Sequence, residues 1–131
     1  MENEKADIVK KAQESLEKMR ESKGSVAEFL KIMAQEVPDV FLHHLGVKDF
    51  TMHYTELDDD CKVLICIAVS AALGQEEMVE SFAMSAKKHD IPYEQVVHAI
   101  LLARFVKSST ALAKSMEAIS LLKKDTQKEE E

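Results

Sequence analysis

The chain has 131 residues, a formal net charge of −7 and a hydrophobic fraction of 46%. This length encloses one sizeable core, so we expect a single domain over residues 1–122, followed by a disordered charged tail over 123–131. The negative charge lies mainly in residues 25–60, where eight acids face only Lys31 and Lys48. Such a surface repels phosphate backbones, which argues against nucleic acid as a partner.

The composition favours helices over strands. Only 3 glycines and 2 prolines are present, and aromatic residues make up 5% of the chain, so turn formers and β formers are both scarce. We therefore predict an all-α fold of about six to seven helices.

No targeting or membrane segment is evident. No apolar run reaches the roughly 18 residues that span a bilayer, and the N-terminus MENEKADIVKK lacks the apolar core of a secretory signal. We expect a cytoplasmic protein without a membrane partner.

Three helices are predicted in the first part of the chain. The apolar period beginning at Ile8 predicts an amphipathic helix over about residues 4–22 that stops near Gly24. The sequence Ser25-x-x-Glu28 is typical of a capping box and opens a second helix, which must end before Pro38. A short third helix is expected over 39–45, closed by Gly46.

Four more helices are predicted in the second part. The fourth begins at the aspartates 58–60 and runs to Leu73, with Gly74 as its C-cap. The fifth starts at Glu76 and ends near His89. A strongly apolar sixth helix covers 93–107, the sequence Ser108-Ser109-Thr110 predicts a break, and a seventh helix covers 111–122.

No metal site or cofactor is expected. Consecutive helical aspartates diverge, so the acids at 58–60 are better explained by their favourable interaction with the helix dipole. The histidines outside the sixth helix offer no pair at the i, i+4 spacing of a helical zinc site: His43, His44, His53 and His89.

From residue 38 to about 119, the sequence pattern resembles the carboxymuconolactone decarboxylase and alkylhydroperoxidase D-like family. Three segments carry the resemblance in the right order: L-D-x-x-x-K-x-L-I-x-I-A-V-x-A-A-L-G at 57–74, the helix M-x-x-x-F-x-M-S-A-K-K that follows, and P-Y-E-Q-V-V-x-A-I from Pro92. The resemblance implies an alkylhydroperoxidase D-like helical bundle that assembles as a homotrimer or hexamer.

Redox members of that family use a glutamate, a C-x-x-C pair and a histidine. Aligned through Gly74, the resemblance places these four functions on Val63, Gln75, Met78 and Phe82. None of these side chains supplies a thiolate or carries a proton in such a cycle, which excludes a peroxidase or disulfide reductase working through that site. An apolar pocket at these positions is expected instead.

His98 and Cys66 are the candidate catalytic residues. His98 stands where many family members carry an acidic residue, and it is either a proton donor or acceptor in a pocket or a histidine of the core or an interface. Cys66, between Ile65 and Ile67, is either a buried structural cysteine or a nucleophile. Cys61 lies five residues before Cys66 in one helix, so the two cannot form a disulfide within it.

Three functions remain open. The first is a carboxymuconolactone decarboxylase-like protein acting on an unknown small molecule, since that branch does not need C-x-x-C. The second is a non-catalytic scaffold, or a protein that binds a small apolar molecule, on the same fold. The third is a thiol enzyme that uses Cys61 or Cys66.

Overall fold

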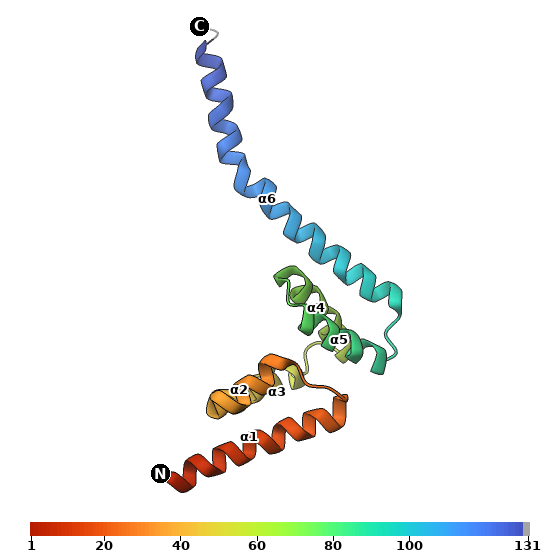
Figure 1. Ribbon diagram of the computed structural model, residues 1–131. Helices are drawn as coiled ribbons and strands as arrows, with labels where there is room; N and C mark the ends of the chain where they lie inside the picture. The colour runs from red at the N-terminus through yellow and green to blue at the C-terminus, as the bar shows by residue number, and fades with distance from the viewer. Residues whose placement is uncertain (130–131) are drawn as a thin grey trace. The chain divides into compact units, whose positions relative to one another are not determined.

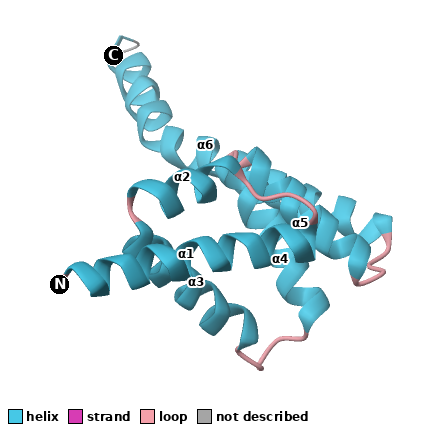
Figure 2. Cartoon of the chain, turned by 60° about the horizontal axis from the view of Figure 1, so that its bottom comes forward, coloured by secondary structure: helices cyan, strands magenta, loops and turns pink. Residues whose placement is uncertain are grey.

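A computed structural model describes residues 1–129, and over these residues it contains six α-helices and no strand. The helices are joined by short loops (Figure 2). The all-α prediction is confirmed. The chain divides into two compact units, residues 1–62 and 63–131, which are described separately below.

Three helices, α1 (Glu2–Lys23), α2 (Glu28–Glu36) and α3 (Pro38–His53), pack against one another in the first unit (Figure 1). Their core is a cluster of three fully or almost fully buried residues, Ala12, Ala34 and Phe41. The two alanines let the helices approach closely around the Phe41 ring, which is completely buried. Larger side chains at helical spacing pack around this cluster: Leu16, Met19, Leu30, Met33, Leu42 and Leu45.

The predicted boundaries of α1 and the end of α2 agree with the structure, but two other predictions in this unit are wrong. The capping box does not form, because α2 begins at Glu28 with Ala27 as its N-cap and without a side-chain cap. Gly46 does not close the third helix, which continues to His53. Only Gly24 and Gly74 have positive φ angles among the glycines, so Gly46 has no left-handed conformation that would stop a helix.

In the second part of the chain, α4 (Asp59–Leu73) and α5 (Glu76–Lys88) fall where they were expected. Asp58 Oδ1 accepts a hydrogen bond from the backbone N–H of Cys61 at 2.8 Å and so caps the first turn of α4. At the other end, Gly74 has φ 71°, which ends the helix.

The core of the second unit is small. Val63 and Ile67 on α4 pack with Ala86 on α5 and with Ile91 in the loop that follows. Three partly buried side chains, Leu64, Phe82 and Val96, complete this cluster, which we call the α4–α5 core. It joins α4, α5 and the beginning of the last helix.

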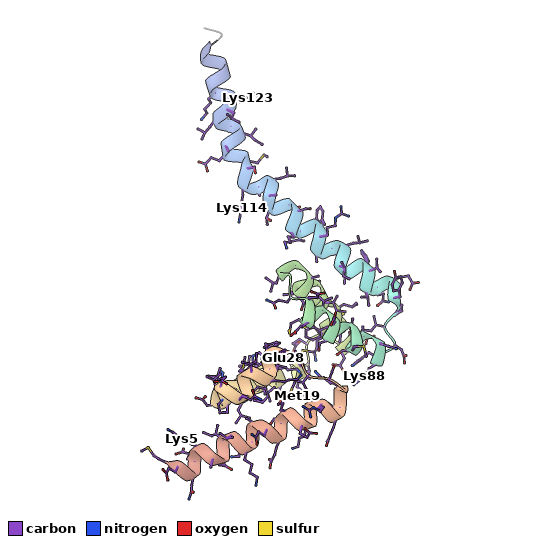
Figure 3. All side chains as sticks on the ribbon, viewed as in Figure 1. Lys5, Met19, Glu28, Lys88, Lys114 and Lys123 are labelled. Carbon is purple, nitrogen blue, oxygen red and sulfur yellow. The ribbon has the colours of Figure 1, made fainter. Side chains whose placement is uncertain are left out.

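The last helix, α6, is a single helix over Tyr93–Glu129, so the predicted break at residues 108–110 is wrong (Figure 1). The hydroxyls at this point bond back to the same helix: Ser108 and Ser109 both donate to the carbonyl of Phe105, at 3.0 and 2.8 Å. Hydroxyls used in this way do not end a helix but often bend it, and α6 changes direction near Lys114 (Figure 3). Residues 123–129, assigned above to a disordered tail, are helical, and 130–131 lie outside the described residues.

Because α6 is continuous, it is longer than either helix predicted for this part of the chain, and its length bears on whether it could cross a membrane. Among the described residues, one helix has the length and composition to cross a bilayer, over Tyr93–Lys124. Neither of the two shorter predicted helices would have had that length.

Candidate functional site

Two of the four positions to which the resemblance assigns a redox site lie in the α4–α5 core. Val63 is 3% exposed, and the partly buried Phe82 packs against the same cluster. The valine and the phenylalanine therefore belong to one apolar cluster. This environment disfavours an ionised group and provides no proton carrier.

The other two positions lie around the start of α5. Gln75 is exposed and is the N-cap residue of that helix, without a side-chain cap bond. Met78, one turn further on, is partly buried. Since a thiolate at a helix N-terminus is what a redox site would need here, a glutamine and a thioether leave the position without a nucleophile.

Cys66 is partly buried on α4, and burial raises the pKa of its thiol. Its carbonyl accepts a hydrogen bond from the hydroxyl of the buried Ser70 at 2.6 Å. The raised pKa lowers the thiolate fraction at neutral pH, which does not favour a nucleophile.

Cys61 is exposed in the first turn of α4, where the helix dipole alone would lower a thiol pKa. The hydrogen bond and the negative charge of Asp58 instead raise the pKa of Cys61. No disulfide joins it to Cys66, as the helical spacing predicts.

His98 is exposed on α6. The α6 residues that pack toward the α4–α5 core or are buried include Val96, Ala99 and Ala103, and Val97 is also half-buried. At 100° per residue, His98 points about 100° or more away from each of these positions around the helix. His98 therefore does not contribute to the α4–α5 core.

No group of three or more metal-ligating side chains occurs among the described residues. His53 is engaged locally, with Nδ1 2.8 Å from the carbonyl oxygen of Asp49 one turn before it. His44 makes an edge-on ring contact with Phe29, with ring centroids 6.5 Å apart.

A groove that the sequence analysis did not predict lies between the end of α4 and the middle of α6. It encloses about 330 Å³ and is open to solvent. Its lining is mostly apolar and comes from Ala71 and Ala72 on α4 and from Ile100 and Ala103 on α6. Two cations and a serine of α6 complete it: Arg104, Lys107 and Ser108.

A second feature of α6 is an apolar stripe that nothing covers within the second unit. It consists of five side chains between 49% and 69% exposed: Leu101, Phe105, Leu112, Met116 and Ile119. At 100° per residue these positions fall within about 60° of the helix circumference. We call these five residues the α6 stripe.

No protein-family model matches this chain, and no curated protein matches it. The family resemblance described above therefore rests on the residues quoted for it.

Proposed function

We propose that the protein is a non-catalytic, self-associating scaffold built on a carboxymuconolactone decarboxylase-like helical fold. The observation that carries the proposal is the packing of Val63 with Phe82 in the α4–α5 core. Where the family's redox chemistry needs an acid and a base beside two thiols, this chain has side chains that stabilise a core. A scaffold protein does not require the acid, the base or the two thiols.

The two cysteines support the same proposal. Both thiols have raised pKa values, Cys61 through Asp58 and Cys66 through burial. A thiol enzyme needs the opposite shift, together with a nearby base. The thiol-enzyme hypothesis is therefore the weakest of the three.

Decarboxylation or lactone chemistry is the second candidate function. The observation in its favour is the groove beside α6, because Arg104 and Lys107 suit an acidic substrate. Such chemistry also requires a group that gives or takes a proton. The residues lining the groove include neither His98 nor Cys66, and the Ser108 hydroxyl already donates to Phe105.

Self-association is argued from the α6 stripe. Its five side chains leave on the order of 500 Å² of apolar surface exposed on each copy, so covering two copies removes about 1,000 Å² from water, which is near the lower limit for a specific interface. A monomer would leave this surface in contact with water. A second copy of the chain supplies an identical apolar stripe.

A lipid bilayer fits the same helix less well. Lys107 and Lys114 lie on the side of α6 opposite the stripe, at 100° per residue. A spanning helix would place these charges against hydrocarbon, whereas a helix paired through its stripe leaves them in water. We propose a cytoplasmic homo-oligomer, and the family resemblance implies a trimer or hexamer.

The oligomeric state tests the proposal. Light scattering of the purified protein at micromolar concentration should give a mass of three or six times the chain's 14.7 kDa. Leu112→Glu should lower that mass, because it places a carboxylate in the centre of the stripe. Thr110→Glu is the matched control: it adds the same charge to the same turn on the opposite face and should leave the mass unchanged.

A wild-type mass near 14.7 kDa would contradict the proposal. Co-sedimentation with lipid vesicles that Leu112→Glu abolishes would assign the stripe to a membrane instead. Turnover of a hydroperoxide with a dithiol donor, abolished by Cys66→Ser, would support the thiol-enzyme hypothesis instead.

A further inference from the structure

We infer that the groove between α4 and α6 binds a small amphiphilic carboxylate, an organic acid with an apolar body. The inference does not depend on the scaffold role, since a scaffold and an enzyme alike could carry such a site. It rests on the composition of the groove, on the distribution of charge along α6 and on the accessibility of the site.

The composition of the groove matches an amphiphilic ligand. Small ligand sites usually enclose a few hundred cubic ångströms and have mostly apolar walls with a few polar groups that fix orientation. This groove encloses about 330 Å³, and alanines with Ile100 make up its apolar lining. Among the described residues, its charged lining consists of Arg104 and Lys107, and both are cations.

Neither cation has an acidic partner among the residues that the structure describes. Among the described residues, ion pairs occur elsewhere, for example in α1, α2 and the first turn of α4. Long cationic side chains can lay their aliphatic stems along apolar surface while the charge stays in water. Arg104 and Lys107 are thus placed to offer two positive charges beside an apolar surface.

The charge distribution along the chain makes these cations stand out. From residue 95 to 116 the sequence contains Arg104, Lys107 and Lys114 and no acid, although the whole chain has a formal net charge of −7. A protein this acidic repels anions in general, so a local cationic segment next to an apolar groove gives selectivity for an anion at one place.

Two carbonyls at the end of α4 already have backbone partners. A helix C-terminus often attracts a lysine or arginine, because its last carbonyls lack partners. Here the backbone N–H of Gln75 donates to the carbonyl of Ser70 at 2.9 Å, and that of Gly74 donates to Ala71 at 3.2 Å. The carbonyls of Ser70 and Ala71 therefore do not need Arg104 or Lys107 as partners.

Most of the groove lies away from the α6 stripe. At 100° per residue, the groove residues Ala103 and Lys107 lie about 180° and 140° from Leu112, the centre of the stripe, whereas Arg104 lies about 80° and Ser108 about 40° from it. A second copy seated on the stripe would leave the Ala103 and Lys107 side of α6 free and would border the groove at Ser108. Ligand binding beside Lys107 is therefore compatible with self-association.

The lining also selects among anions. Inorganic phosphate has no apolar part that would gain from alanine and isoleucine contacts, and a nucleic acid would meet the acidic surface elsewhere on the chain. A carboxylate with a hydrocarbon body gains from both parts of the groove, since burial of its carbon atoms adds to the charge-assisted hydrogen bonds of its head.

The test is isothermal titration of the full chain with octanoate, octanol and inorganic phosphate at two salt concentrations. Octanoate should bind, more weakly at higher salt, and octanol and phosphate should each bind at least about tenfold more weakly, because each lacks one of the two contributions. Lys107→Met removes a charge from the groove but keeps an unbranched stem, and it should weaken octanoate binding about tenfold.

Lys114→Met is the matched control. It removes the same charge from the same helix two turns further on and lies outside the groove lining, so octanoate binding should be unchanged. Equal losses in the two variants would show a diffuse charge effect and overturn the inference. Equal binding of octanol and octanoate, or no octanoate binding by a wild-type protein with an intact thermal melt, would also overturn it.

Discussion

Asp58 Oδ1 accepts a hydrogen bond from the backbone N–H of Cys61 at 2.8 Å, so one carboxylate both caps α4 and sits beside the exposed thiol. The pKa values of the two residues shift in opposite directions. The N–H of Cys61 stabilises the carboxylate and lowers the pKa of Asp58 below its ordinary value of 3.8. The carboxylate in turn raises the pKa of the Cys61 thiol. The Asp58 carboxylate thus caps the helix and lowers the reactivity of the Cys61 thiol.

Asp58→Asn should make Cys61 more reactive. The amide oxygen can still cap the helix, but without the negative charge the thiol pKa falls and the thiolate fraction at neutral pH rises. Alkylation by iodoacetamide at pH 7, followed at Cys61 by mass spectrometry, should become faster by a factor of a few. Asp59→Asn is the control, because Asp59 pairs with Lys62 and is not among the groups that raise the Cys61 pKa. An equal acceleration in both variants would refute this assignment.

The Asp58 cap should also show in the pH dependence of stability. Because the pKa of Asp58 is lowered in the folded protein, its contribution is present above the ordinary value of 3.8 and is lost as the pH falls through the lower folded value. Asp58→Ala should therefore lower the melting temperature at pH 7, and the difference from wild type should shrink below pH 3.8. A difference that is constant with pH would mean that the carboxylate charge plays no part.

Introducing the redox residues of the alkylhydroperoxidase D-like family tests the α4–α5 core. The quadruple variant Val63→Glu, Gln75→Cys, Met78→Cys and Phe82→His buries a carboxyl group at a position that is 3% exposed and removes apolar volume beside it. We expect a loss of several kcal/mol and a clear fall in melting temperature. Gln75→Cys alone is the control, since Gln75 is exposed and should tolerate the change. An unchanged melt with disulfide reductase activity would show a hydrated site instead of a packed core.

Local signals in the sequence predicted the elements whose ends depend on local geometry. Gly24 and Gly74 both adopt the left-handed conformation that ends a helix, and the ends of α1 and α4 were accordingly placed well. Residues that are compatible with both a helix break and a continuous helix led to a wrong prediction. The hydroxyls at 108–110 suit a helix break, but they can equally donate to carbonyls one turn back, and this alternative is the one that forms in α6.

The sites depend on relations between helices that local patterns do not contain. The groove exists because Ala71 on α4 lies near Ala103 on α6, and neither alanine stands out in its own helix. The side of α6 on which His98 lies also depends on which face of that helix packs inward. A helical projection of the unbroken segment 93–129 would have shown the α6 stripe, but the predicted break at 108–110 divided it between two helices.

Gly46 provides the sharpest test of a corrected boundary. It lies inside α3 without a positive φ, and a Cβ built on it meets no atom within 4 Å. Gly46→Ala should therefore raise the stability by about 0.5–1 kcal/mol, because alanine restricts the unfolded chain and favours the helix.

Gly74→Ala is the matched comparison, because the same methyl group is added where φ is +71° and should lower the stability. Chemical denaturation of the two variants, read beside wild type, should thus give shifts of opposite sign. If Gly46 ended the helix in a left-handed conformation, as the sequence suggested, both variants would be destabilised. A loss of stability in both variants would support the shorter helix over 39–45 instead of α3 as described.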